Sequence, residues 1–452
     1  MKQAIAYLVA ALFSVAASAT IYETNDLQRA NLKTVEEWTK AQGAAANSGE
    51  IVVERALRLD KKAGEVVVLA EFCGIDPAAT IEFPIVGETS DRDYESLFRT
   101  FARPGAIARA IEALGVPRGA NVDGRTMNFW PRGERVSIEV APFGATNATY
   151  EPIQKYIVDM QTRAPVAYDS FVYCGSPDDP ASKDGARLCD AEAPNSVFST
   201  YNEPQTVIDM PAVCPQSDVY ERFLLSPTSG LKPFGLYTLR FRPAKKAGGE
   251  GRVRNYTLQI LKGAEYDLVL DGAKTHYKAA TDLLLAVRDV VKSGFDPFVS
   301  VVFDDAVTLD EAIAQAQMIG KIEGENGIRV VGPSATSVYY KGFLPNKSWR
   351  IAKDRPSQPW EVHFGTSTNG VREIRMVKTL EDWTSTDSLD PILTSREFTV
   401  KTPEEMLSTM EANDHGLPVV LVFAKADDPL SVFMPAVRLL KSRHPTVYFF
   451  AE

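Results

Sequence analysis

The chain lacks several features that mark large functional classes of proteins. After its first residues it has no uncharged apolar run of about eighteen residues, so we expect no transmembrane segment once the N-terminal stretch is removed. Its lysines and arginines are scattered, and the formal charge is −10, which argues against nucleic acid or an anionic membrane as the main partner. With 45% hydrophobic residues, the 452-residue chain can instead fill several hydrophobic cores.

Ligands for metals and cofactors are also scarce. The four histidines lie far apart in the sequence, at His276, His363, His415 and His444, and no two cysteines have C-x-x-C spacing. Zinc sites and thiol redox sites need closer groupings than these. The glycine-rich stretch 248–251 does not lead from a strand into a helix, as a dinucleotide site requires. We therefore expect no bound metal and no cofactor.

The N-terminus has the pattern of a secretory signal. Lys2 precedes an apolar stretch from Ala4 to Ala16, and the small residues Ala17, Ser18 and Ala19 follow it. Residues 1–19 therefore predict a signal peptide cleaved after Ala19. The alternative is that the segment is retained as a membrane anchor, but it is shorter than the roughly twenty residues that a spanning helix needs. The predicted location is periplasmic or secreted.

Export gives the cysteines a possible role as disulfide partners, because extracytoplasmic compartments are oxidising. The candidates are Cys73, Cys174, Cys189 and Cys214. Four cysteines allow three connectivities, and sequence does not choose among them. The Cys174/Cys189 pair closes the shortest loop and would leave Cys73 with Cys214, which is the pairing that we favour.

The pattern of the chain predicts an α+β protein in several parts. Residues 20–49 form an N-terminal helix and linker, with a capping box from Thr34 to Glu37. Residues 50–243 hold many short valine-rich strands and one amphipathic helix, which begins at Pro104 and stops at Gly115. One helix among many strands favours a β-rich sheet or sandwich with a single covering helix.

After a Gly- and Lys-rich boundary the pattern changes to two small α/β modules. Residues 252–333 and 395–452 each read as helix, strand, helix, strand, and the stretch 334–394 reads as a connecting β segment. In sequence, Phe303-Asp304-Asp305-Ala306-Val307 stands where Phe423-Ala424-Lys425-Ala426-Asp427-Asp428 stands later. Capping boxes begin helices at Thr308 and Thr402, and a further helix is expected from Pro429 to Lys441. The near copy predicts duplication of one module.

These modules resemble the periplasmic domain of the ExbD/TolR proteins over about residues 255–333 and 395–452. In that family the first strand runs into an Ala-Asp-Lys-Asp-Val-Pro-like turn, which Ala424, Asp427 and Pro429 match, while Lys425 replaces an acidic residue. The family's functional acidic residue lies in a transmembrane helix, which this chain lacks after the signal. The resemblance therefore implies only what such soluble domains do, which is to dimerise and to contact periplasmic proteins or peptidoglycan.

The β-rich part resembles the YdjY-type bacterial domain over about residues 50–243. Five blocks in the family's order carry the resemblance: Tyr94-Glu95-Ser96-Leu97, Leu114-Gly115, Val158-Asp159-Thr162, Val172-Cys174-Gly175-Ser176 and Asn202-Pro204-Asp209-Pro211. The family has no assigned reaction, so the resemblance implies a fold and no chemistry.

A few residues remain as candidate contacts. Paired carboxylates at Asp304-Asp305 and Asp427-Asp428 suit a divalent cation, or else cap the helix that follows each pair. Trp349 and Trp360, near several lysines and arginines, suit a stacking platform for a carbohydrate or peptide, or else lie in a core. Glu95 beside Ser96 lacks the Gly-x-Ser-x-Gly elbow of a hydrolase and has no histidine nearby in sequence.

Two functional hypotheses follow. The first is a non-catalytic exported protein that binds an envelope partner through its small modules, with a homodimer as one possible assembly. The rival is a hydrolase-like enzyme of unrecognised type with a site between the β-rich domain and the modules. Convergence of Glu95, Ser96 or Asp209 with a histidine would favour the enzyme. The sequence names no ligand, partner or reaction.

Overall fold

A computed structural model describes residues 26–46, 49–123, 128–145, 149–178, 189–246, 249–326, 329–331, 340–344, 359–366, 372–382, 392–413, 419–441 and 446–452. The predicted signal peptide with Ala19 lies outside these residues. The chain divides into two compact units. Unit 1 comprises Met1–Val122 and Trp130–Arg252, and unit 2 comprises Asp123–Phe129 and Val253–Glu452.

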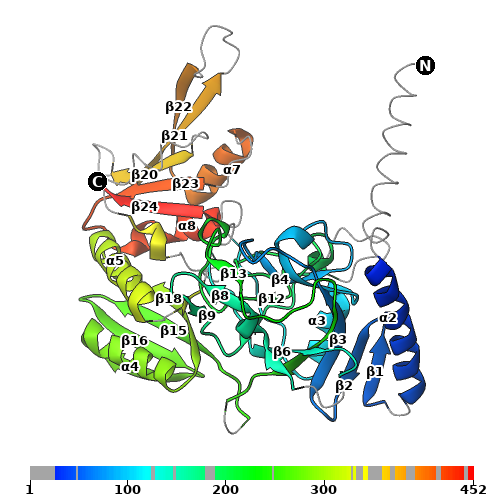
Figure 1. The fold of residues 1–452 in the computed structure, drawn as a ribbon. Helices are drawn as coiled ribbons and strands as arrows, with labels where there is room; N and C mark the ends of the chain where they lie inside the picture. The colour runs from blue at the N-terminus through cyan, green and yellow to red at the C-terminus, as the bar shows by residue number, and fades with distance from the viewer. Residues whose placement is uncertain are drawn as a thin grey trace, which may run out of the picture. The chain divides into compact units, whose positions relative to one another are not determined.

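Unit 1 is built around a closed ring of strands (Figure 1). In spatial order the ring contains β3 (Glu65–Phe72), β14 (Leu236–Pro243), β6 (Arg135–Pro142), β10 (Phe171–Tyr173), β12 (Ile208–Asp209), β11 (Ser196–Phe198), β4 (Phe83–Gly87) and β5 (Ser96–Thr100). The ring closes because β5 pairs with β3. The β-rich character is as predicted, but the sheet or sandwich that we expected is a barrel.

The closure depends on β3, whose two halves have different partners on one edge. Its first half pairs with β2 (Leu57–Asp60), and its second half, from Ala70 to Phe72, pairs with β5. The strand is buried along almost its whole length, which suits the run Val66-Val67-Val68-Leu69. A strand with both edges paired and both faces covered leaves no open sheet edge there. Strand β1 (Ile51–Glu54) extends the sheet beyond β2.

Four short strands complete unit 1. Strand β7 (Glu151–Pro152) pairs with β6, and β13 (Phe223–Leu225), β8 (Ile157–Asp159) and β9 (Ala164–Pro165) form a small separate sheet. The predicted covering helix is α3 (Pro104–Ala113), whose buried residues pack against β2, β3, β11 and β14.

The N-terminal helix α2 (Asp26–Ala45) is held to the barrel by a buried polar contact. Asn31 Nδ2 donates to Glu71 Oε2 at 3.0 Å, and Gln28 Nε2 donates to Glu71 Oε1 at 3.2 Å. The predicted capping box at Thr34 is wrong, because Thr34 lies inside the helix and its hydroxyl donates to the carbonyl of Ala30. Eight residues of polar helix precede it, and their lack of apolar periodicity hid the true start.

Unit 2 contains two five-stranded sheets with the same strand order (Figure 1). The first sheet runs β17 (Ala273–Tyr277), β16 (Glu265–Leu270), β15 (Val253–Leu261), β18 (Asp296–Phe303), β19 (Arg329–Val330), and the second runs β22 (Ile392–Val400), β21 (Arg372–Asp382), β20 (Trp360–Thr366), β23 (Val419–Ala424), β24 (Thr446–Ala451). In each, an antiparallel three-stranded meander is followed by two parallel strands. Helices α4 (Ala280–Lys292) and α5 (Leu309–Asn326) belong to the first, and α7 (Pro403–Asn413) and α8 (Met434–Leu440) to the second.

The stretch 334–394 is not a connector. It supplies β20 and β21, and β20 pairs in parallel with β23 at the centre of the second sheet. Sequence reasoning placed the second module at 395–452 because the helix, strand, helix, strand pattern is visible there. The meander before that pattern has strand period and no turn signal that ties it to the helices, so its membership depends on hydrogen bonding across the sheet.

The predicted helix starts at Thr308 and Thr402 are confirmed, and at the second the amide of Glu405 donates to Thr402 Oγ1 at 3.1 Å. The amide of Glu311 donates to Thr308 Oγ1 at 3.3 Å, and Glu311 Oε2 accepts from the amide of Thr308 at 3.0 Å. The helix expected from Pro429 to Lys441 is broken into a 3-10 turn at Leu430–Val432 (η7) and the short helix α8. Pro435 explains the break, because it has no amide for the preceding turn.

The two sheets of unit 2 are joined by four main-chain hydrogen bonds with local two-fold symmetry. The amide of Leu309 donates to the carbonyl of Asp428, and the amide of Leu430 donates to that of Val307. One step further out, the amide of Asp310 bonds to Ala426 and that of Ser431 to Asp305. Thr308 and Pro429 thus occupy equivalent positions on the axis and pair with each other as an isolated antiparallel bridge.

A single hydrophobic core runs through both sheets of unit 2. It includes Val301 and Phe303 of the first sheet together with Val422, Phe433 and Phe449 of the second. Phe343 stacks on Phe449 with ring centroids 4.6 Å apart. The two sheets therefore form one folding unit. Among the residues that the structure describes, no helix has both the length and the apolarity that crossing a bilayer requires.

Candidate functional site

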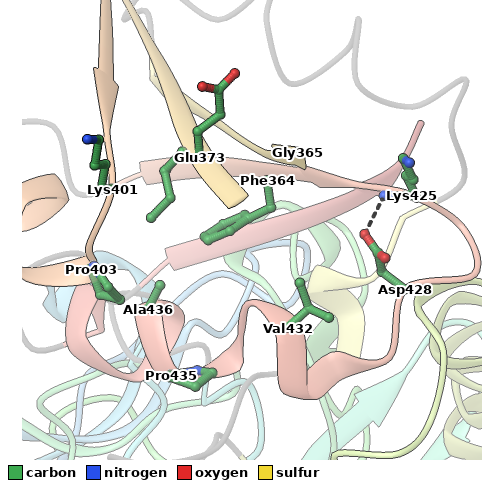
Figure 2. Close-up of a pocket in the computed structure, with 11 residues that line it drawn as sticks. Phe364, Gly365, Glu373, Lys401, Pro403, Lys425, Asp428, Val432, Pro435 and Ala436 are labelled. Carbon is green, nitrogen blue, oxygen red and sulfur yellow. Dashed lines mark hydrogen bonds between the residues drawn. The ribbon is translucent and has the colours of Figure 1, made fainter. Parts of the chain in front are cut away.

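The second sheet of unit 2 holds a cavity of about 170 Å³ between the sheet and the segment that carries η7 and α8 (Figure 2). Its walls come from the ends of β20 and β23, the start of β21 and the approach to α7. The residues that line it are Phe364, Gly365, Glu373, Ile374, Lys401, Pro403, Lys425, Asp428, Val432, Pro435 and Ala436. Parallel strands β20 and β23 both end at this cavity, which is where open α/β sheets commonly bind ligands.

The cavity has an apolar interior and charged ends. Phe364 and Ala436 are almost fully buried, and their side chains face the space between sheet and helix (Figure 2). Lys401 and Lys425 lie at its two ends, and both are exposed. The carboxylate of Asp428 accepts a hydrogen bond from the amide of Lys425 at 3.3 Å and so closes the turn after β23. A site of this kind accepts a small molecule or chain end with an apolar part and a charge.

The four predicted aspartates act in two turns and are not gathered into one site. Asp304 Oδ1 accepts from the amide of Ala306 at 2.8 Å, so it caps a turn like Asp428 does. Asp305 is exposed and pairs with Arg438 across the two sheets at 2.9 Å. Asp427 is exposed. Within the described ranges, no group of three or more His, Cys, Asp or Glu side chains is placed to hold a metal ion. Asp304 and Asp428 accept amide hydrogen bonds within turns, whereas Thr308 caps the helix that follows the first pair.

The predicted stacking platform is wrong for Trp360, which is the one of the two tryptophans that the structure describes. Trp360 is fully buried in β20. Its ring centroid lies 5.9 Å from that of Phe398, with the two rings tilted, and the ammonium group of Lys378 lies 5.3 Å from the Trp360 centroid. A ring with no exposed surface cannot stack on a sugar or peptide in solution. Trp349 lies outside the described residues.

The cysteines are all free and buried, so neither favoured disulfide is formed. Each thiol lies on a different segment of unit 1: after β3, after β10, before the 3-10 turn Asp190–Glu192, and in the loop before Gln216–Asp218. Burial raises the pKa of all four, and that of Cys214 to about 11. Thiols in such sites stay protonated at neutral pH and react slowly.

The closing YdjY-like block forms a polar clasp inside unit 1. Asn202 Nδ2 donates to Asp209 Oδ1 at 3.0 Å and to the carbonyl of Ala212 at 2.9 Å, and its Oδ1 accepts from the amide of Cys214 at 2.6 Å. Asp209 is fully buried, and this burial raises its pKa well above the usual value. The clasp ties the segment before β12 to the segment after it, so the motif has a structural role.

A second polar group surrounds the first YdjY-like block. Arg92 Nη1 lies 3.9 Å from Glu203 Oε1, and the guanidinium stands 4.9 Å from the centre of the Phe83 ring. Burial raises the pKa of Glu203, and burial together with the nearby charge of Glu82 raises that of Glu95. Ser96 is buried, and its hydroxyl donates to the carbonyl of Arg92 at 2.5 Å.

The enzyme hypothesis required one of these groups beside a histidine. No histidine occurs in the sequence between residues 20 and 252, so unit 1 has none to offer Glu95, Ser96 or Asp209. The structure describes two histidines, both in unit 2. His276 Nδ1 lies 2.9 Å from Asp267 Oδ1, and the His363 ring stacks on that of Phe423 with centroids 4.6 Å apart. The convergence that would have reversed our order of hypotheses is therefore missing within unit 1.

Sequence reasoning missed the cavity and its lysines. Lys425 was considered only as a residue that replaces an acidic one in a turn, and Lys401 was not considered. The signal that could have found them is the comparison of the two modules position by position, which needs the correct register.

The fold defines a class: a β-barrel domain followed by a pair of α/β sheets, the second of which carries a ligand-sized cavity. Residues 57–213, which include most of the barrel, match the family model of the YdjY domain, and the predicted resemblance to that domain is thereby confirmed. The chain is also 31% identical over 131 residues to the cytochrome c biogenesis ATP-binding export protein CcmA of Novosphingobium aromaticivorans. That match covers 28% of this chain and 63% of CcmA, so the chain spans less than two thirds of that relative.

Proposed function

We propose that the protein is an exported, non-catalytic interaction protein that binds an extended segment of another envelope protein through unit 2. The observation that carries this proposal is the β21–β22 hairpin, which projects beyond the rest of its sheet as an arm (Figure 1). Export itself rests on the signal-like N-terminus, and the ExbD/TolR-like character of the two modules rests on their sequence pattern.

The arm extends beyond Trp360, the first residue of β20. Strand β21 pairs with β20 only as far as Lys378, whereas its pairing with β22 continues to Asp382. Beyond that point each strand has a single hydrogen-bonded neighbour in the described part of the chain. Leu393 lies in this section and is 55% exposed. Because a two-stranded ribbon is only marginally stable in water, an added third strand would stabilise it.

The topology of unit 2 supports the same proposal. Soluble domains of the ExbD/TolR type dimerise, and here two modules of one topology are already joined about a local two-fold axis within one chain. We infer that they arose by duplication of one module. A pair formed within the chain has no need of a second copy to complete it, so its outer strands are available to a different partner. The likeness to CcmA adds no ATP-binding role, since the sequence has no G-x-x-x-x-G-K-[ST] motif.

The test is a photo-crosslinking amino acid placed at Leu393 of the full chain in living cells. The matched control position is Leu285 on α4 of the first module, which is 47% exposed. The proposal expects one discrete adduct from position 393 and none from 285, with mass spectrometry identifying the partner. N-terminal sequencing of the same protein should begin at Thr20.

Three results would contradict the proposal. An adduct that contains a second copy of this chain would replace the foreign partner by a homodimer. An absence of adducts at 393, or equal adducts at both positions, would remove the arm as a binding surface. A protein that retains Met1 and fractionates with the cytoplasm would exclude the envelope.

A further inference from the structure

The cavity in the second sheet exists because two filling side chains of the first sheet are replaced there. The joining bridge aligns Thr308 with Pro429, and counting along each chain aligns Phe303 with Ala424 and Gln315 with Ala436. The strand registers then align Ile260 with Phe364 and Tyr266 with Ile374, since Ile260 pairs with Phe303 and with Tyr266, and Phe364 pairs with Ile374.

In the first sheet the position equivalent to the cavity is filled by side chains. The Tyr266 side chain reaches across to the helix, and its hydroxyl donates to Gln315 Oε1 at 2.6 Å. In the second sheet, isoleucine and alanine stand at these two positions, and neither reaches the other. One void in the core of the first sheet has a volume of about 10 Å³ and is lined by apolar residues such as Leu258 and Val299. The contact between Tyr266 and Gln315 therefore occupies in the first sheet the position that is open in the second.

The size of the cavity limits what it takes. Its volume of about 170 Å³ corresponds to about five or six water molecules at roughly 30 Å³ each. The interior surface is provided by Phe364, Ile374 and Ala436, all nearly buried. A small aliphatic side chain fits such a space, whereas an aromatic ring with its attached backbone exceeds it.

The charges at the rim differ between the modules at three positions, since the same counting also places Asp428 opposite Val307 and Val432 opposite Glu311. Lys401 corresponds to Lys278 and Glu373 to Glu265, so these charges are common to both. Lys425, however, replaces Asp304, which reverses the charge at the end of the central parallel strand. Among the described residues, neither Lys401 nor Lys425 has a side-chain hydrogen bond or ion pair, while Asp428 is engaged by the turn. The second cavity is thus more positive than its counterpart by two charges at that position.

We propose that this cavity binds an α-carboxylate carried by a small aliphatic residue. The aliphatic group lies against Phe364 and Ile374, and the carboxylate is held by the ammonium group of Lys425, the positive charge that the first sheet lacks. A free amino acid and the C-terminus of a peptide both offer this chemistry. The proposal is independent of the β21–β22 arm and goes beyond partner binding there.

Calorimetric titration of the full mature chain tests it with three probes: N-acetyl-L-valine as a peptide end, free L-valine, and N-acetyl-L-valine amide, which lacks the carboxylate. One or both acids should bind and the amide should not, and the preferred acid identifies the source. Lys425→Ala should weaken binding about tenfold, as loss of a charge-assisted hydrogen bond does, and Lys401→Ala, at the other end of the cavity, should weaken it less. Lys278→Ala, at the equivalent rim of the first sheet, is the control and should change nothing.

A filled variant provides the second line of evidence. Ile374→Tyr with Ala436→Gln recreates the pair that closes the first sheet and should abolish binding while the protein stays folded. The lysine variants keep the test decisive if this double variant fails to fold. Three results would overturn the proposal: equal binding of acid and amide, no binding of either acid at about 10 mM, or an equal loss in Lys278→Ala. A concentration of about 10 mM detects even binding of about 3 kcal/mol.

Discussion

Glu71 and Arg99 form an ion pair from which water is excluded, with both side chains 0% exposed. Arg99 Nε donates to Glu71 Oε1 at 3.2 Å, and Gln28 and Asn31 of α2 satisfy the same carboxylate. The pair lies where β5 closes the barrel on β3, since Glu71 and Arg99 are register partners of these strands. One buried carboxylate therefore holds both the barrel closure and the N-terminal helix.

Removing that carboxylate should destabilise unit 1 strongly. Glu71→Ala leaves the Arg99 charge buried without its main partner, which costs about 3–5 kcal/mol. Urea unfolding followed by alkylation of the buried thiols measures this, because all four cysteines lie in unit 1. The control is Glu54→Ala, whose ion pair with Arg109 is about half exposed on both sides and should cost below about 1 kcal/mol. Similar losses in the two variants would show that the buried pair contributes nothing special.

The stability of unit 1 should fall as pH rises above the ordinary range of carboxyl groups. Burial raises the folded-state pKa of Asp209 and of Glu203, so the folded chain holds these protons more tightly than the unfolded chain, where an Asp titrates near about 3.9. Stability from these protons is complete below the unfolded pKa and is lost as pH rises through the folded pKa.

Asp209→Asn should flatten this dependence, because the amide oxygen still accepts from Asn202 and Met210 but no longer titrates. Unfolding free energies measured by urea between pH 4 and pH 8 compare the variant with the parent. Asp76→Asn, at an exposed turn residue, is the matched control and should leave the profile unchanged. An identical pH profile for parent and Asp209→Asn would contradict the assignment.

Unit 2 should unfold as one unit because its core crosses both sheets. Phe433 is fully buried, and its ring centroid lies 5.9 Å from that of Phe364 and 5.8 Å from that of Phe449. Phe433→Ala should cost about 3–5 kcal/mol and lower the stability of both sheets together. Hydrogen exchange of β15 and β23 reports the two sheets separately. If β23 loses protection while β15 keeps it, the two sheets are independent and the shared core is not what stabilises them.

The thiols should be unreactive in the folded protein and all present in the unfolded protein. Burial raises the pKa of Cys214 to about 11, so little thiolate forms at neutral pH, and the other three thiols are equally enclosed. Thiol titration without reductant should detect almost none at pH 7.5 and four after denaturation. A count of two or zero after denaturation would restore the disulfides that the sequence suggested.

Several features could be predicted from local pattern alone. The run of valines predicts β3, and the helical period with its end signals predicts the helix from Pro104. The capping pairs Thr308/Glu311 and Thr402/Glu405 have the expected hydrogen bonds. The YdjY resemblance rested on short blocks in order and holds. The start of α2 and the break at Pro435 were missed, because a polar helix has little periodicity and a single proline decides the second.

The comparison of the two modules failed by one residue. Sequence matching put Phe303 opposite Phe423, whereas the hydrogen bonds around Thr308 and Pro429 put Phe303 opposite Ala424. In a strand a shift by one residue moves every side chain to the other face. Phe423 accordingly lies on the far face, stacked with His363 and Phe450, and the position of the cavity was hidden.

The sequence by itself determined most of the strands and helices, the signal-like start, and the presence of a YdjY-like block, because each depends on neighbouring residues along the chain. Tertiary structure alone decided that β5 returns to close a barrel on β3, that β20 and β21 join the second sheet, and that one module is filled by Tyr266 where the other is open. These outcomes depend on contacts between residues distant in sequence, whose register no local pattern encodes.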